Sequence, residues 1–346
     1  METEQKPGCD LVTGALGFAG LHLVGALLTA GHTVVGLGRQ PDGTPSPATA
    51  GDFRRHPGAA SGLPVAYTGP AGRLDYHETG LEDAATLARI VKVERPRVIY
   101  HLAAQSSAAA SFEAPHETFT ANLLGTLNLL EAVRALPVGD RPMVIAVGSA
   151  EEYGPQPEDA PPLTEGAPLA PLSPYAVSKV AQTLLCRQYH RSYGLPVIVA
   201  RPFSHTGPGQ NPRFAFPSFA RQIAAAEAGR GPAEILTGDL SPVRDFLDVR
   251  DVVRAYRALA ARGRPGQTYN ICSGTALTME GGLRILVAAA TVPITVRHDP
   301  SRDRPSDTPR LVGDNSKLRS ETGWLPEGDA ASALLDLLAE ARKEFS

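Results

Sequence analysis

The sequence predicts an α/β protein, a Rossmann-like doubly wound parallel sheet followed by a smaller C-terminal domain. Short apolar runs alternate with segments of helical period as far as about residue 200. The first apolar run leads directly into a glycine turn and a helical segment, as in a nucleotide-binding βαβ unit. Beyond Arg201 the alternation loosens. We expect residues 1–200 and about 240–272 to form the first domain, and residues 201–239 and 273–346 the second.

The predicted elements follow one another in the order that such a sheet requires. Strands are predicted at residues 9–13, 33–37, 97–102, 142–147 and 196–200, and helices at about 21–28, 81–93, 116–135 and 175–193. Residues 40–72 are rich in proline and glycine, which favours a loop with a possible weak strand at 65–67, and residues 154–171 predict a second loop. Further helices are predicted at about 216–228 and 329–345.

The composition limits the possible functions. With 346 residues, 42% hydrophobic, the chain can bury a large core, and a net charge of -3 with a pI near 6.3 gives no general attraction for nucleic acid or an anionic membrane. An anionic substrate would therefore need specifically placed arginines. Three cysteines without metal-ligand spacing imply neither a disulfide framework nor a metal site. No apolar leader or membrane-length run is present, so we expect a soluble, cytoplasmic protein.

The glycine turn predicts dinucleotide binding. It runs Gly14-Ala15-Leu16-Gly17-Phe18-Ala19-Gly20 between a strand and a helix, where glycines allow backbone N–H groups to approach a pyrophosphate. An ordinary tight turn is the alternative. An acidic residue ending the second strand would bind a ribose 2′-hydroxyl, whereas Arg39 stands there and suits a 2′-phosphate. We therefore predict NADP(H), possibly NAD(H), unless Arg39 merely ends the strand.

A tyrosine and a lysine lie four residues apart near the start of a predicted helix. This spacing places Tyr175 and Lys179 on one helical face, where the ammonium group could lower the pKa of the phenol and hold it beside a ligand. Such a phenol could transfer a proton near neutral pH. A chance pair on a solvated helix would have the same spacing.

Together these motifs resemble the extended short-chain dehydrogenase/reductases that act on nucleotide sugars, and in particular the GDP-mannose branch. The resemblance rests on the glycine turn, His101-Leu102-Ala103-Ala104-Gln105-Ser106, Asn122 with Gly125-Thr126, Ser149, and the Tyr175 and Lys179 pair. It implies that Tyr175 is the general acid/base on the sugar O4, that Lys179 lowers its pKa and holds the nicotinamide ribose, and that Ser149 hydrogen-bonds the same oxygen. It also implies cofactor contacts from Leu102, Ala103, Ala104, Asn122 and Pro202.

The resemblance further implies a GDP-sugar substrate. Candidate contacts are Gln105, Ser106, Ser204 and His205, although the family usually has asparagine where this chain has Ser204. Arg244 and Arg304 would bind the diphosphate, since guanidinium groups match phosphate oxygens; nearby Asp245 and Asp307 allow surface salt bridges instead. The segments 201–210, 243–251 and 304–310 are similar to those of GDP-4-keto-6-deoxy-D-mannose reductases, which predicts NADPH-dependent reduction of the C4 ketone to GDP-D-rhamnose.

Two other functions stay open. Glu151 stands where the 4,6-dehydratases of this branch carry the base that removes the C5 proton, so a nucleotide-sugar dehydratase with tightly bound NADP is the alternative. A noncatalytic dinucleotide-binding protein on this fold is more remote, because a binder has no need of Ser149, Tyr175 and Lys179. We expect a homodimer, since the helices predicted at about 116–135 and 175–193 carry apolar faces and match the family's dimer helices.

Overall fold

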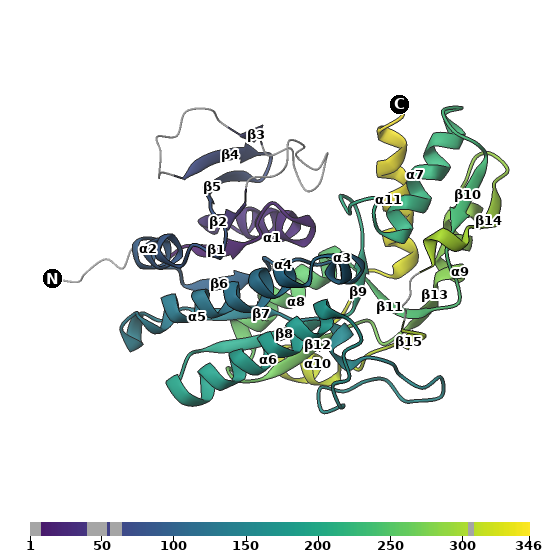
Figure 1. The fold of residues 1–346 in the computed structure, drawn as a ribbon. Helices are drawn as coiled ribbons and strands as arrows, with labels where there is room; N and C mark the ends of the chain where they lie inside the picture. Colours follow the sequence, from purple (N-terminus) through teal and green to yellow (C-terminus); the bar gives the residue numbers. More distant parts are fainter. Residues whose placement is uncertain (1–7, 40–53, 56–63, 304–307) are drawn as a thin grey trace.

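The computed structural model describes residues 8–39, 54–55, 64–303 and 308–346, and its centre is a nine-stranded sheet (Figure 1). Seven neighbouring strands run parallel, in the order β12 (Thr268–Ile271), β8 (Val197–Pro202), β7 (Met143–Val147), β6 (Val98–His101), β1 (Asp10–Thr13), β2 (Val34–Gly38) and β5 (Gly72–Glu78). β4 (Val65–Gly69) and β3 (Arg54–Arg55) continue this edge antiparallel. The predicted Rossmann-like parallel sheet is confirmed.

Helices cover both faces of the sheet, which explains why its strands are apolar on both sides. Leu11 packs into a core with α2 (Ala84–Glu94), α5 (Gly125–Arg134) and α6 (Pro174–Tyr193). The next residue, Val12, faces the opposite core, which is formed with α1 (Phe18–Thr29), α8 (Val249–Arg262) and α10 (Ser316–Thr322). No helix among the described residues has the length and apolar character to span a bilayer.

A second group of elements lies beside one end of the sheet (Figure 1). Its helices α7 (Ala215–Glu227), α9 (Met279–Ala288) and α11 (Ala330–Lys343) share one apolar core. Its strands are β9 (Ser204–Thr206), β11 (Val243–Asp248), β13 (Ala276–Thr278) and β15 (Arg310–Leu311), with a separate parallel pair of β10 (Glu234–Thr237) and β14 (Thr295–His298). Because β8 runs directly toward β9, the chain enters this group at the carboxyl end of the sheet.

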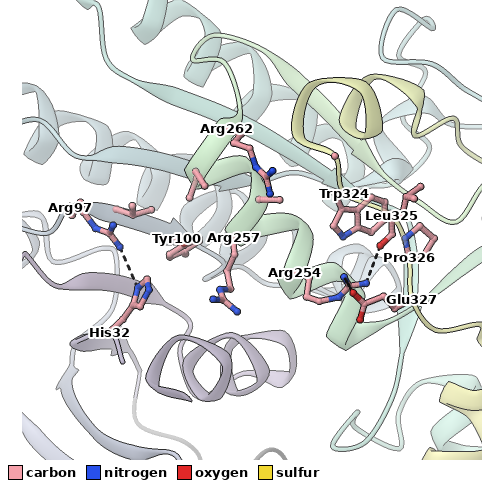
Figure 2. Close-up of a pocket in the computed structure, with 15 residues that line it drawn as sticks. His32, Arg97, Tyr100, Arg254, Arg257, Arg262, Trp324, Leu325, Pro326 and Glu327 are labelled. Atoms are coloured by element: carbon pink, nitrogen blue, oxygen red, sulfur yellow. Dashed lines mark hydrogen bonds and ion pairs between the residues drawn. The ribbon is translucent and has the colours of Figure 1, made fainter. Parts of the chain in front are cut away.

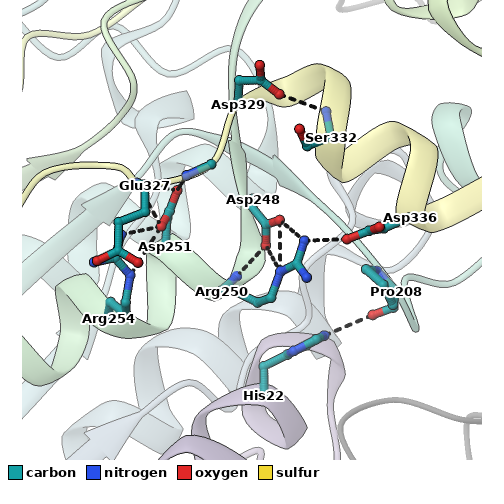
Figure 3. Close-up of polar contacts among 11 residues, drawn as sticks. His22, Pro208, Asp248, Arg250, Asp251, Arg254, Glu327, Asp329, Ser332 and Asp336 are labelled. Carbon is teal, nitrogen blue, oxygen red and sulfur yellow. Dashed lines mark hydrogen bonds and ion pairs between the residues drawn. The ribbon is translucent and has the colours of Figure 1, made fainter.

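The start of α8 joins the two groups through charged side chains (Figure 3). Asp248 caps the helix by accepting from the Arg250 N–H at 2.7 Å, and the Arg250 guanidinium bonds both Asp248 and Asp336 of α11. On α1, the His22 ring bonds the Pro208 carbonyl oxygen at 2.9 Å. These contacts hold the loop after β9 against α1, and hold the helix α11 against α8.

The possible strand at 65–67 is confirmed as part of β4. One strand was missed: β5 was not predicted because Leu74 and Tyr76 are its only apolar residues. The helix predicted at about 116–135 is confirmed as a continuous helical segment of α4 (Pro115–Phe119), a π-helical turn (Thr120–Leu124) and α5, and the short helix α3 (Ala108–Glu113) precedes it. The domain bounds stay a prediction; α10, which lies in the predicted second domain, packs on α8 and β12, because Leu318 is buried in the sheet's core.

Candidate functional site

A cavity of about 990 Å³ lies between the carboxyl ends of the parallel strands and the second group of elements. Ligands of open α/β sheets bind at this end of the strands. Eighteen of the residues predicted from the sequence line it: Gly14, Leu16, Gly17, Phe18, Ala19, Gly20, Leu102, Ala103, Ala104, Ser106, Ser149, Glu151, Tyr175, Lys179, Pro202, Ser204, His205 and Arg244. The structure therefore brings most of the predicted site together, although the chain positions span more than 200 residues.

The glycine turn forms one wall and leaves no space for side chains. Gly14 has a φ of +70°, and a Cβ there would lie 2.9 Å from the Ala103 backbone nitrogen; a Cβ on Gly20 would lie 2.1 Å from the Gly14 carbonyl oxygen. Gly17 is the N-cap of α1 and supplies no side-chain cap, so the N–H groups of the first turn keep their hydrogen-bonding capacity. This geometry suits a pyrophosphate.

Ser149 is held in place from both sides at the end of β7. Its backbone N–H donates to the Glu152 carboxylate at 2.9 Å, and its Oγ accepts from the Glu151 N–H at 3.2 Å. The Ser149 side chain also lies close enough to Tyr175 to lower the pKa of its phenol. Both residues line the cavity.

Tyr175 lies in the first turn of α6, where Ser173 caps the helix by accepting from the Ala176 N–H at 3.1 Å. The phenol is buried, and this burial, with the nearby Glu151 carboxylate, raises the pKa of Tyr175, against a smaller lowering by the Ser149 hydroxyl. Lys179 is not among the groups that shift the pKa of Tyr175 here, so the predicted lowering by Lys179 stays a prediction. A raised pKa keeps the phenol protonated at neutral pH.

The ammonium group of Lys179 is held by two hydrogen bonds at the end of β7. Its ammonium group donates to the Val147 carbonyl oxygen at 2.8 Å and to Gln182 Oε1 at 3.0 Å. Burial lowers the pKa of Lys179 to about 8, and the Glu152 carboxylate opposes this shift. The lysine is thus a buried cation at the cavity wall whose charge is lost only on the alkaline side of neutrality.

A buried ion pair beneath these residues was missed from the sequence. Glu152 accepts from Arg201 at 2.7 Å and from the Thr183 hydroxyl at 2.8 Å, besides the Ser149 N–H, and both charged side chains are almost fully buried. The Arg201 guanidinium also stacks on Tyr153, 4.5 Å from the ring centroid. The position of Ser149 therefore depends on Glu152.

Asn122 and Gln105 do not line the cavity, contrary to their predicted cofactor and substrate contacts. Asn122 is buried in the π-helical turn, where it accepts from the Gln105 N–H at 2.8 Å and donates to Ser178 at 2.9 Å. Ser178 in turn donates to the Tyr175 carbonyl oxygen. Asn122 thus ties the loop after β6 to the first turn of α6 and positions Tyr175 indirectly, which fits the frequent occurrence of π-helical turns at functional sites.

The other predicted binding residues differ in their surroundings. Arg39 is exposed after β2 and lies outside the lining of the cavity, while Arg304 lies outside the described residues. The His205 ring stacks on Phe18 with centroids 5.9 Å apart, and burial lowers its pKa. The Arg244 guanidinium donates to the carbonyl oxygens of its own strand neighbour Val243 and of Thr308.

Two further arginines at the cavity were missed. Arg213 donates to Ser106 Oγ at 3.3 Å, and Arg302 lines the cavity from a 3-10 turn, paired with Asp299. Both come from loops of the second group, where the sequence offers no periodic pattern. The described residues contain no cluster of three or more His, Cys, Asp or Glu side chains that could hold a metal ion.

Comparison with known proteins identifies the family. The model of a family described as GDP-mannose 4,6-dehydratase matches residues 11–335. The chain belongs to this family. It is 39% identical to GDP-6-deoxy-D-mannose reductase of Pseudomonas aeruginosa over 71% of this chain and 81% of that protein, and 30% identical to GDP-mannose 4,6-dehydratase of Sinorhizobium fredii over 96% and 95%.

A solved structure supports the same relationship. The structure of RMD from Pseudomonas aeruginosa complexed with NADPH is similar at a TM-score of 0.79, with 33% identity over 97% of this chain and 99% of that chain. This member of the GDP-mannose 4,6-dehydratase family is thus an oxidoreductase with the fold of the extended short-chain dehydrogenase/reductases. The family resemblance predicted from the sequence is confirmed.

Proposed function

We propose that the protein reduces the C4 ketone of GDP-4-keto-6-deoxy-D-mannose with NADPH and forms GDP-D-rhamnose. The observation that carries the proposal is that Ser149 and Tyr175 line the wall of a cavity that is also lined by the glycine turn. The similarity to a protein named GDP-6-deoxy-D-mannose reductase, and to RMD in complex with NADPH, favours this substrate and cofactor.

The chain offers a suitable place for a nicotinamide dinucleotide. The glycine turn from Gly14 to Gly20 would hold the pyrophosphate with backbone N–H groups, and Arg39 at the end of β2 suits a 2′-phosphate, which favours NADP(H) over NAD(H). When bound, the reduced cofactor supplies the hydride that the ketone carbon accepts. Leu102, Ala103, Ala104 and Pro202 complete this part of the cavity.

The protein's own side chains would handle the proton. Ser149 and Tyr175 would hydrogen-bond the ketone oxygen, and the phenol would donate its proton as negative charge develops on that oxygen. The phenol of Tyr175 is protonated before the reaction and can therefore act as a donor, although its raised pKa also makes it a weaker acid. Lys179, a buried cation beside the end of β7, would favour the phenolate that remains.

Arginines would hold the anionic part of the substrate. Arg244, Arg213 and Arg302 line the cavity on the side of the second group, where guanidinium groups suit diphosphate oxygens. Ser106, Ser204 and His205 lie on the same wall and offer hydrogen bonds to the sugar. The chain's net charge of -3 makes such local placement necessary.

A nucleotide-sugar 4,6-dehydratase is the second candidate, and Glu151 is the observation that favours it. Its carboxylate lines the cavity and is close enough to Tyr175 to raise the phenol's pKa. A carboxylate in this position could remove the C5 proton of a 4-keto intermediate. The 30% identity to GDP-mannose 4,6-dehydratase of Sinorhizobium fredii is consistent with this chemistry.

Two incubations distinguish the candidates. With GDP-4-keto-6-deoxymannose and NADPH, the pure protein should consume the nicotinamide absorbance; no consumption with either reduced cofactor would exclude a reductase. With GDP-mannose and no added reductant, a 4-keto product that disappears in Glu151→Gln would establish a dehydratase instead. Activity that is unchanged in Tyr175→Phe would assign any turnover to a contaminant and favour a noncatalytic binder.

We also propose a homodimer formed through α5 and α6 in a reducing compartment such as the cytoplasm. Val177 and Leu184 of α6 are 41% and 53% exposed, and Leu124, next to α5, is 49% exposed. Such apolar side chains on neighbouring helices suit burial against a second copy. A monomer at micromolar concentration by light scattering would contradict the dimer. The three cysteines are buried and free, which fits reducing conditions.

A further inference from the structure

A second cavity lies at the opposite end of the sheet. Its volume is about 750 Å³, and it shares no lining residue with the cavity described above. His32 and Arg97 line it immediately before the strands β2 and β6, and the last turns of α8 and the segment 323–327 form the other walls. Figure 2 shows these side chains around the opening. It is therefore separate from the proposed reaction site.

Arginine dominates the charge of this cavity. Four guanidinium groups line it, from Arg97, Arg254, Arg257 and Arg262, against the single carboxylate of Glu327. Alanines at 258, 260 and 261 form part of the wall and leave space between the long side chains. A positive cluster of this kind is unexpected in a chain with a net charge of -3.

Two of the four guanidinium groups are neutralised and two are not. Arg97 donates to Asp10 at 3.1 Å, and Arg254 forms ion pairs with Asp251 and Glu327. By contrast, Arg257 and Arg262 form no hydrogen bond or ion pair with any described residue. In Figure 2 the Arg257 guanidinium lies between the His32 and Arg97 pair and Arg254, and no dashed line joins it to a neighbour. Two adjacent turns of α8 thus present unpaired positive charge to one concave surface.

We propose that this cavity binds a small molecule that carries a diphosphate or two closely spaced phosphate groups. Planar guanidinium groups bind phosphate oxygens in a bidentate manner, and two unpaired groups match two phosphates. The volume lies within the usual range for small-molecule sites, about 300 to 1,000 Å³. Nucleic acid is disfavoured by the overall negative charge of the chain. The site is independent of the proposed reductase activity.

The test is calorimetric titration of inorganic pyrophosphate into the full chain at low salt, and the same titration of Arg244→Ala identifies any binding in the other cavity. We expect binding by the wild type, a loss of about tenfold or more in affinity in Arg257→Ala, and a larger loss in the Arg257→Ala/Arg262→Ala protein. Arg230→Ala is the matched control, because Arg230 is an exposed arginine outside both cavities and should leave the affinity unchanged.

Three results would overturn the proposal: no binding by the wild type, equal affinity in the double variant, or equal affinity for malonate, which would show that the site does not prefer phosphate. Turnover and the thermal unfolding midpoint of the double variant serve as folding controls, because neither arginine belongs to the proposed reaction site. Should the double variant unfold, Arg257→Lys replaces it, because lysine keeps the charge but loses the bidentate geometry. We expect Arg257→Lys to bind pyrophosphate with reduced affinity, and an unchanged affinity would contradict the assignment.

Discussion

Removing the charge of Glu152 should destabilise the fold and the proposed reaction site together. Glu152 and Arg201 form an ion pair at 2.7 Å with side-chain exposures of 0% and 3%, and Glu152 also accepts from Thr183 and the Ser149 N–H. Leaving one partner of a buried pair uncompensated costs about 3 to 5 kcal/mol. We therefore expect Glu152→Gln to lower the free energy of unfolding by about 3 kcal/mol, near the lower limit because the amide oxygen still accepts.

The measurement is urea unfolding followed by the fluorescence of Trp324, the only tryptophan of the chain and a buried one. Replacing both partners, in Glu152→Gln/Arg201→Met, should recover part of the loss, since the uncompensated charge is gone. Glu158→Gln is the matched control at an exposed position and should change stability by less than about 0.5 kcal/mol. A loss below about 1 kcal/mol in Glu152→Gln, or strictly additive effects, would refute the reasoning.

Four further predictions follow from the site. Tyr175→Phe should lower the turnover number by about 10² to 10⁴ without changing the circular dichroism spectrum, and a smaller loss would exclude the phenol as proton donor. Gly20→Ala should weaken NADPH binding, measured by fluorescence titration, by at least about tenfold, because its Cβ would lie 2.1 Å from a backbone oxygen. Gly139→Ala is the control and should leave binding unchanged, because a Cβ at position 139 would have no atom within 4 Å. Arg244→Ala should raise KM for the GDP sugar about tenfold or more with a smaller change in kcat. Lys179 loses its proton as the pH rises through about 8, so kcat should fall above that pH. Because the Glu152 carboxylate raises the pKa of Lys179, Glu152→Gln should move this fall to lower pH. A pH profile of kcat that is the same in Glu152→Gln would contradict the coupling.

The sequence was sufficient to predict the strands and helices whose apolar residues follow a regular period. The strands at Asp10–Thr13, Val98–His101 and Met143–Val147 are short apolar runs between helical segments, so periodicity identified them. β5 was missed because a strand at the margin of the parallel sheet alternates apolar and charged residues. The π-helical turn at Thr120–Leu124 interrupts a continuous helical pattern, which periodicity cannot reveal.

The same distinction holds for the site. Residues in motifs of fixed spacing, such as the glycine turn and Tyr175 with Lys179, reach the predicted cavity. Their environment did not follow from the sequence: the phenol pKa is raised because burial and Glu151 outweigh other influences, and spacing along a helix says nothing about burial. Arg213 and Arg302 come from loops whose approach to the cavity is decided by tertiary packing.

The most direct test of the central claim follows the hydride itself. NADPH that carries deuterium at both C4 positions of the nicotinamide ring is incubated with GDP-4-keto-6-deoxymannose and the pure protein, and the product is analysed by mass spectrometry and proton NMR. Our account predicts one deuterium at C4 of a GDP-6-deoxyhexose in the wild type, and none in Tyr175→Phe over the same time. A product without deuterium at C4, or no product, would contradict it.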